Sequence, residues 1–447
     1  MQKSVSGALR YRWFIFSILS SLYLLVYFHR VCPAIMAPEL MKAFNLGGAS
    51  LGILSSGYFY AYAAMQLPVG VLVDSWGSRK TITVFALIGA VGVFLFSISE
   101  GFALATLSRV LVGLGLSAVF VPTLRIFAEW FPPSTYASVS GGLMAMGGVG
   151  WFTAGTPLAL LTVVFGWRGT FVIIGGLTVL LSVLTWFYVA DKPAHRGYPA
   201  VYRKGASAGH ATSARFSILH GIGFVLKEKQ FWFLGVWFFS FGALLFGFSG
   251  LWAGPYLMDV YHLTKTRTGN ILAMLALGVM IGSPLLGYVS DRIFRERKKV
   301  MLGSSFLLMV VWIVLFTSPA HLPPWVMYPL FLCLGIFGNG IAVVGFAAVK
   351  ELFPMEIGGT AVGMVNFLPF LGAAIYQPLV GYMMDQVGKM DGAYPLAAYK
   401  VSFILFLITS VAHFLSAAAF WQGEQQMIGK ESIEEGNRLA KPCIGRH

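Results

Sequence analysis

The chain has 447 residues, of which 57% are hydrophobic and 11% charged, and its mean hydropathy is +0.77. Soluble globular proteins of this length are less apolar, so the composition excludes that class and indicates an integral membrane protein. The net charge of +14 does not indicate nucleic-acid binding, because the basic residues lie in loops between apolar runs. Three cysteines provide no even-numbered disulfide framework.

Apolar segments of roughly 20 residues, the length that spans a bilayer, follow one another along the whole chain. In the first half we expect spans at 13–37, 49–73, 80–99, 102–127, 137–163 and 168–189. In the second half we expect them at 230–257, 268–290, 299–318, 325–349, 359–384 and 397–421. The pattern predicts an all-α membrane protein whose twelve transmembrane helices form two six-helix bundles. The predicted domains are a bundle at 1–190, a cytoplasmic linker at 191–229, a bundle at 230–422 and a cytoplasmic tail at 423–447.

The first span carries two charged or titratable residues in the stretch "YFHRVCPAIMA", from Tyr27 to Ala37. An Arg at the centre of a membrane helix costs roughly 2.5 to 3.5 kcal/mol on insertion scales, and such residues usually mark a ligand or ion pathway. Arg30 suits a carboxylate or phosphate because its planar guanidinium binds such groups in a bidentate manner. Tyr27 lies one turn before Arg30 and can share its ligand. His29 is a candidate proton carrier, although it lies about 100° round the helix from Arg30.

The second span has a polar stripe formed by Tyr58, Tyr62 and Gln66, which recur at every fourth position. Such a stripe faces a cavity or another helix rather than lipid. Further substrate-binding candidates are Arg125, Trp252, Asn339 and Asn366, with Tyr376, Gln377 and Lys350 as weaker ones. Each has a plain alternative: Arg125 can pair with Glu129 one turn later, and a single amide or aromatic often joins two helices.

The loop charges predict the orientation of the chain. The linker at 191–229 carries seven Lys or Arg, and the connection after the eighth span adds five, whereas the connection at 319–324 has none. The positive-inside rule then places the N-terminus, the linker and the C-terminus in the cytoplasm. We expect an uncleaved first helix and a location in the cytoplasmic (inner) membrane of a bacterium.

The two halves of the sequence resemble each other. "GVLVDSWGSRK" (70–80) joins the second and third spans, and "GYVSDRIFRER" (287–297) joins the eighth and ninth. A second echo pairs "EWFP" (129–132) with "ELFP" (351–354). Two similar six-helix halves are typical of transporters whose substrate site lies between the halves, near the middle of the bilayer.

At "GVLVDSWGSRK" the chain resembles the major facilitator superfamily, whose corresponding loop has the form G-x-x-x-D-x-x-G-x-R-K. "RVLVGLG" (109–115) is similar to that family's fourth-helix motif. The resemblance implies that the loop's acid and basic cluster latch the two bundles together in one access state. An acid beside cations at the membrane surface can also make charge-assisted bonds that break when the bundles rock. The predicted gating residues are Gly70, Asp74, Gly77, Arg79 and Lys80, together with Gly287, Asp291 and Arg292 of the second copy.

Other stretches resemble particular branches of this family. "YFHRVCPAIMAPEL", "ELFPMEIGGTAVGM" and "GYMMD" look like helices of organic-anion and organophosphate transporters. Organophosphate antiporters usually have a second Arg in the seventh helix, where this chain has Phe246, which argues against sugar-phosphate exchange. The order of glycines near Pro157 differs from that of drug/proton antiporters, which argues against drug export.

What the sequence lacks also bears on function. We find no clear carboxylate in the middle third of any predicted span, so we expect an anionic substrate. We also find no phosphate-cradling loop and no Cys/His metal spacing, so we expect neither cofactor nor metal. The predicted function is secondary transport of a small organic anion, most simply a carboxylate, by a monomer in the lipid bilayer, with proton symport through His29. The alternatives are an organophosphate or phosphate exchanger, a non-transporting sensor of an anion, and a membrane enzyme, which lacks a visible nucleophile and base.

Overall fold

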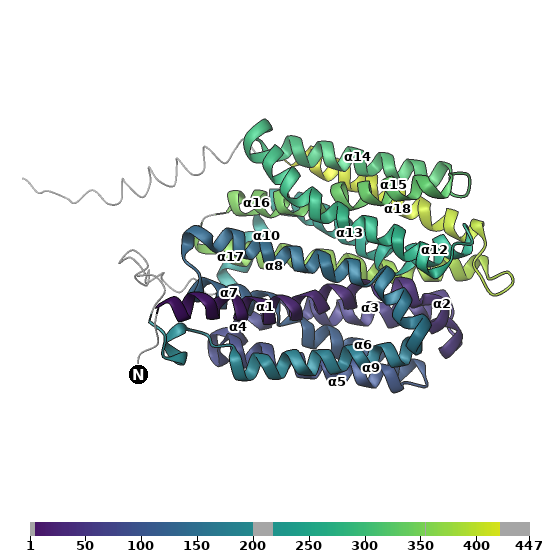
Figure 1. Cartoon of the computed structure of the whole chain (residues 1–447). Coiled ribbons are helices and arrows are strands. Elements are labelled where there is room, and N and C mark those ends of the chain that lie inside the picture. Colours follow the sequence, from purple (N-terminus) through teal and green to yellow (C-terminus); the bar gives the residue numbers. More distant parts are fainter. Residues whose placement is uncertain (1–4, 200–217, 354, 421–447) are drawn as a thin grey trace, which may run out of the picture.

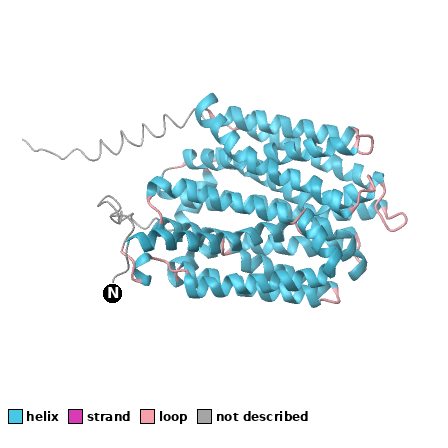
Figure 2. Cartoon of the chain, in the orientation of Figure 1, coloured by secondary structure: helices cyan, strands magenta, loops and turns pink. Residues whose placement is uncertain are grey.

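The structure, a computed structural model, describes residues 5–199, 218–353 and 355–420 (Figure 1). Within these residues the regular structure is helical, apart from one β-bridge between Met390 and Ala393, and short loops join the helices (Figure 2). The linker is described only in part, and the predicted tail at 423–447 lies outside the described residues. The predicted domain boundaries therefore stay predictions.

The N-terminal half occupies the lower part of Figure 1, and its helices run side by side across the view. Its helices are α1 (Val5–Val31), α2 (Pro33–Phe44), α3 (Gly48–Ala64), α4 (Gln66–Trp76), α5 (Ser78–Ile98), α6 (Phe102–Ser117), α7 (Phe120–Trp130), α8 (Pro133–Thr153) and α9 (Thr156–Tyr188), followed by the short η1 (Pro193–Arg196).

The C-terminal half occupies the upper part of the same view. Its helices are α10 (Ile218–Lys227), α11 (Lys229–Gly242), η3 (Ala243–Trp252), α12 (Ala253–Asp259), α13 (Lys265–Tyr288), η4 (Val289–Phe294), α14 (Arg297–Thr317), η5 (Pro324–Val326), α15 (Met327–Cys333), η6 (Leu334–Gly340), α16 (Ala342–Leu352), α17 (Met355–Val387) and α18 (Leu396–Ala419). The segments η3, η4 and η6 are π-helical.

The prediction of a helical membrane protein with twelve spans in two bundles is confirmed. Ten of the described helices are long and apolar enough to cross a membrane. The second predicted span is divided at Met65 into α3 and α4, and the fifth consists of α8 and the start of α9. A bend at Gly166, with φ of 66°, separates the fifth span from the sixth inside α9. Side chains such as Val163 and Val164, each 72% exposed, present apolar surface to the lipid.

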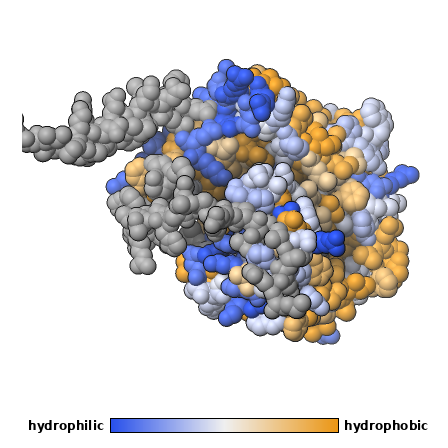
Figure 3. Space-filling model, turned by 60° about the vertical axis from the view of Figure 1, so that its left-hand side comes forward, coloured by the Kyte–Doolittle hydropathy of each residue, from blue (hydrophilic) through white to orange (hydrophobic). Residues whose placement is uncertain are grey.

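The two ends of the bundle differ in what they carry. We call the end where α1 begins the linker face, at the left of Figure 1, and the opposite end the distal face. Hydrophilic residues gather around the linker face, while apolar residues cover the flanks (Figure 3). The halves meet along a seam where α17 packs on α3 and α4, α13 packs on α8 and α9, and α12 packs on α2.

Candidate functional site

Arg30 lies at the seam between the two halves and is enclosed by aromatic rings. It belongs to α1 and is only 3% exposed. Its Cζ atom lies 4.3 Å from the ring centre of Tyr27 and 4.6 Å from that of Tyr62, both in the N-terminal half. The other half supplies Phe370 at 4.9 Å and Phe246 at 5.9 Å. We call Arg30 with these four rings the Arg30 site, which joins both halves around one cation.

The protein does not neutralise the charge of Arg30. Among the described residues no carboxylate forms an ion pair with it, and its Nε atom is buried without a hydrogen-bond partner. Aromatic faces attract a cation by about 0.5 to 2 kcal/mol each, which offsets only part of the cost of burying it. An anion bound beside the guanidinium would offset the rest.

Local backbone features bring these rings together. Pro33 starts α2 directly after α1, and because proline has no backbone N–H, the helical hydrogen-bond pattern is interrupted just beyond Arg30. Gly147 on α8 lets that helix approach the site, because a Cβ there would lie 2.8 Å from the Tyr27 ring. Phe246 belongs to the π-helical segment η3, and π-helical turns occur frequently at functional sites.

Amide side chains join the halves next to the Arg30 site. The Nδ2 atom of Asn366 on α17 donates to Oε1 of Gln66 on α4 at 2.8 Å, and Gln66 donates to the Tyr62 carbonyl at 3.1 Å. Gln377 donates to the Phe246 carbonyl at 3.0 Å, while the Trp252 indole donates to the Gln377 carbonyl at 3.0 Å. The Oε1 atom of Gln377 is buried without a partner. The structure thus brings Gln66 and Asn366 together across the seam, whereas the contacts of Trp252 with Gln377 and Tyr394 lie within the C-terminal half.

The structure separates His29 from Arg30. The His29 ring lies 6.0 Å from the Phe171 ring on α9, inside the N-terminal half, and both ring nitrogens are buried without a hydrogen-bond partner. Arg109 on α6 donates to the His29 carbonyl at 2.9 Å, and its Cζ lies 5.2 Å from the Tyr58 ring. Tyr58 stacks on Tyr62 at 5.8 Å between ring centres, so it connects the two arginines.

Two other predicted substrate contacts lie apart from the Arg30 site. Arg125 forms an ion pair with Asp74 at the linker face, where the two side chains are 53% and 74% exposed. Asn339 lies in η6 and is half-buried, and no described side chain bonds its amide. The structure gives neither residue a contact with the site.

The predicted gating residues lie at the linker face, each set within its own half. Gly77, with φ of 85°, makes the turn between α4 and α5. A Cβ at this position would lie 2.7 Å from the Asp191 carboxylate. That carboxylate accepts a hydrogen bond from the Arg79 backbone N at 2.6 Å. In the second copy Asp291 pairs with Arg297, which also contacts Glu351 at 3.0 Å. The remaining predicted residues, Gly70, Lys80, Gly287 and Arg292, make no contact across the seam that the structure records.

The distal face is closed by contacts that do cross the seam. Asp385 near the end of α17 accepts from the backbone N of Gly48 at 2.7 Å and of Ala49 at 2.8 Å, at the start of α3. The Tyr394 hydroxyl donates to the same carboxylate; burial and this bond raise the pKa of Tyr394. Nearby, Lys265 pairs with Glu39 at 2.6 Å, again between halves. We call this group of contacts the distal latch.

Sequence reasoning missed several residues of the site. The sequence distinguishes Phe246 only by the absence of an Arg at its position, and Phe370 carries no signal in a chain with 38 phenylalanines. Arg109 belongs to the fourth-helix motif and is not among the predicted site residues, although an Arg inside the predicted span at 102–127 is the same signal that identifies Arg30. Two acids of the distal latch, Asp385 and Glu39, lie in the stretches "GYMMD" and "YFHRVCPAIMAPEL", but the sequence alone does not reveal that they bind the other half.

Comparison with known proteins places this geometry in context. The model of the Major Facilitator Superfamily matches residues 19–348 and 248–445. Among curated relatives, the Bacillus subtilis uncharacterized transporter YybO is 28% identical over 89% of this chain and 92% of its own length. The hexuronate transporter of the same organism is 25% identical, over 83% and 87% of the two lengths. The probable sulfoacetate transporter SauU of Cupriavidus necator is 25% identical, over 85% and 89%.

Solved structures show the same fold. A bacterial homologue of the human lysosomal transporter Spinster, in an inward-facing and unoccupied conformation, superposes with a TM-score of 0.73 at 18% identity. The match covers 92% of this chain and 99% of that one.

Proposed function

The chain belongs to the major facilitator superfamily and is a multi-pass membrane transporter rather than an enzyme, and we propose that it moves a small organic carboxylate by alternating access. The observation that carries this proposal is Arg30, which is buried at the seam of the two halves and has no carboxylate partner among the described residues. A site that both halves line can be exposed to one side and then the other when the halves rock.

The chemistry of the site favours a carboxylate over a phosphate ester. One guanidinium binds one carboxylate through two parallel hydrogen bonds, whereas a dianionic phosphate is better matched by two cations. Phe246 occupies the position where organophosphate antiporters carry a second Arg, and its ring faces Arg30 at 5.9 Å. The relatives named for hexuronate and sulfoacetate support a small organic acid as the substrate class.

The polar groups around the cation suit a hydroxylated acid. Gln377 has a buried oxygen without a partner, and Gln66 and Asn366 bridge the halves beside Tyr62. Hydroxyl groups of a sugar acid can pair with such amides while the carboxylate binds Arg30, and the aromatic rings can cover the carbon skeleton.

We propose that the linker face is cytoplasmic and that the membrane is the cytoplasmic membrane of a bacterium, with the protein acting as a monomer. The basic residues of the linker and of the connection after the eighth span support this orientation. With the distal latch closed, the structure then corresponds to a state closed toward the outside.

Proton symport is the finer part of the proposal, with His29 as the proton carrier. The His29 ring does not face Arg30, so its charge would act through Arg109, which binds the His29 carbonyl and contacts Tyr58. A proton on His29 would alter the position of Arg109 and Tyr58, and therefore the affinity of the Arg30 site for an anion.

Uptake into proteoliposomes tests the proposed substrate class. Purified protein would be reconstituted, and uptake of a hexuronate, sulfoacetate, a hexose phosphate and a neutral hexose would be compared. We expect uptake of at least one carboxylate, inhibited by other carboxylates and not by the neutral hexose. Preference for the hexose phosphate would overturn the carboxylate assignment, and binding of an anion without flux would identify a sensor.

A further inference from the structure

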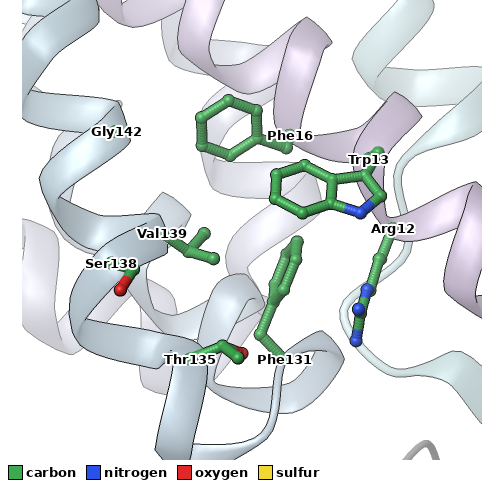
Figure 4. A pocket seen from close by; sticks show the side chains of 8 residues that line it. All are labelled: Arg12, Trp13, Phe16, Phe131, Thr135, Ser138, Val139 and Gly142. Carbon is green, nitrogen blue, oxygen red and sulfur yellow. The ribbon is translucent and has the colours of Figure 1, made fainter.

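Another cation, with no acidic partner among the described residues, lies in a cavity between α1 and α8 at the linker face, away from the Arg30 site. The cavity has a volume of about 360 Å³. Its lining, shown in Figure 4, consists of Arg12, Trp13 and Phe16 of α1, Phe131, and Thr135, Ser138, Val139 and Gly142 of α8. We propose that this cavity, the α1–α8 pocket, binds the headgroup of an anionic phospholipid and the start of its acyl chain.

The charge of the pocket comes from Arg12 alone. Its Cζ lies 5.0 Å from the Phe131 ring and 6.0 Å from the Trp13 ring, and its Nε is buried without a hydrogen-bond partner. No carboxylate pairs with Arg12 in the part of the chain that the structure describes. A phosphate oxygen would satisfy the guanidinium.

The remainder of the lining is apolar, which distinguishes this pocket from a site for a small hydrophilic acid. Phe16 stacks on Phe127 with 5.4 Å between ring centres, and Trp13 meets Phe131 edge-on at 5.4 Å. Phe131 is almost fully buried, whereas Trp13 is 50% exposed. A cation at the rim of an aromatic cavity suits an amphiphile, because burial of the acyl chain against the rings removes apolar surface from water.

The depth of the pocket also matches a phospholipid headgroup. Arg12 precedes Arg30 by 18 residues of one continuous helix, α1, which corresponds to about 27 Å. The bilayer is about 40 to 45 Å thick including headgroups. Half of that thickness is about 20 to 22 Å. The predicted span at 13–37 is centred near residue 25, which Arg12 precedes by 13 residues or about 20 Å, so Arg12 lies in the headgroup layer and Arg30 lies about 7 Å past the middle. Trp13 and Phe14, 50% and 44% exposed, are aromatic residues of the kind found at that interface.

Native mass spectrometry of the detergent-purified full chain, titrated with phosphatidylglycerol or phosphatidylcholine, tests the proposal. We expect wild type to retain phosphatidylglycerol in preference to phosphatidylcholine, and Arg12→Gln to reduce the retained phosphatidylglycerol by about fivefold. Arg10→Gln is the matched control, because Arg10 is an exposed residue of the same helix that does not line the pocket. Equal losses in both variants would mean general surface attraction and would overturn the pocket.

Two further arms keep the test decisive. Ser138→Phe fills the cavity while keeping Arg12, so it should lower lipid retention, and unchanged retention would overturn the proposal even if Arg12→Gln misfolds. Glycerol 3-phosphate should not displace the lipid at equal concentration; displacement would identify a soluble anion as the ligand. Arg30→Gln should retain the lipid as wild type does, which makes this result independent of the proposed transport function.

Discussion

The two faces of the molecule use charged side chains in opposite ways. At the distal face Asp385 of the C-terminal half binds the backbone of Gly48 and Ala49 in the N-terminal half. At the linker face Asp74 binds Arg125 within the same half. Asp385 and Glu39 at the distal face therefore hold the halves together, while the ion pairs of Asp74 and Asp291 recorded at the linker face each stay within one half.

The glycines of the two faces show the same contrast. A Cβ on Gly381 would overlap the Gly48 carbonyl, and one on Gly52 would overlap the backbone at Gln377, so α3 and α17 are in backbone contact at the distal face. A Cβ on Gly70 or Gly287, in the repeated motif, would meet nothing within 4 Å. Unlike Gly77, whose positive φ and closeness to Asp191 require a glycine, Gly70 and Gly287 have no packing reason in this state. We infer that they are needed in the other state, when the linker face closes.

The largest effect on transport is expected when a larger side chain is placed where the two halves contact each other at the distal face. Gly381→Val should lower uptake into proteoliposomes by about 10- to 100-fold, because the new side chain prevents α17 from contacting α3 and thus prevents distal closure. Gly303→Val on the outer helix α14 is the control, since a Cβ there meets nothing within 4 Å. Wild-type uptake by Gly381→Val would show that the seam need not close as described.

Removing the charge of the distal latch should have the next largest effect. Asp385→Asn weakens charge-assisted hydrogen bonds worth roughly 1.5 to 3 kcal/mol, so the distal-open population should rise by about tenfold or more. Distances between spin labels on α2 and α12 would measure this population. The control is Asp391→Asn, which changes an exposed acid of the adjacent loop. An unchanged distance distribution in Asp385→Asn would contradict the role of the latch.

Removing the acid of the linker-face motif should affect turnover and not distal closure. The Asp74–Arg125 pair is exposed and contributes about 0 to 1 kcal/mol to stability, so Asp74→Asn should fold normally. We expect a severalfold lower transport rate with ligand affinity changed by no more than a few fold, because the residue lies far from the Arg30 site. A wild-type rate would remove the reason for assigning Asp74 a gating role.

The smallest effect on exchange is expected for His29→Gln. Gln keeps a polar side chain in the buried position between Phe28 and Phe171, so downhill exchange should stay within a few fold of wild type. Accumulation driven by an inward proton gradient should be lost, because Gln does not bind a proton. Accumulation that persists in the variant would exclude His29 as the proton carrier.

The sequence predicts the helices of this protein well and the packing of its site poorly. Long apolar runs are bounded by charges, so twelve spans follow from hydropathy, and an Arg within such a run identifies Arg30. The separation of His29 from Arg30 is also implied by the 100° step between neighbours on a helix. The division of the fifth span at Ala154 and Gly155 is not visible in hydropathy, because both parts are apolar.

The aromatic partners of Arg30 lie beyond sequence reasoning for a physical reason. Phe246 and Phe370 are far apart in the chain, and they meet because η3 and α17 pack against α1 and α3. A ring in a membrane helix has the same pattern whether it faces lipid or a cation. Arg125 has the charge of a site residue and lies at the surface instead, since an Arg near a span end reaches the aqueous face.

Equilibrium binding of an organic carboxylate to the purified protein, measured for wild type and Arg30 variants, tests the central claim most directly. A carboxylate that raises the unfolding temperature of wild type should bind Arg30→Lys at least about tenfold more weakly, because lysine lacks the planar fork. Arg30→Ala should show no measurable binding, whereas Arg125→Ala, which removes a linker-face cation outside the Arg30 site, should bind as wild type does. Wild-type affinity in Arg30→Ala would contradict the assignment of the substrate site to the seam between the two halves.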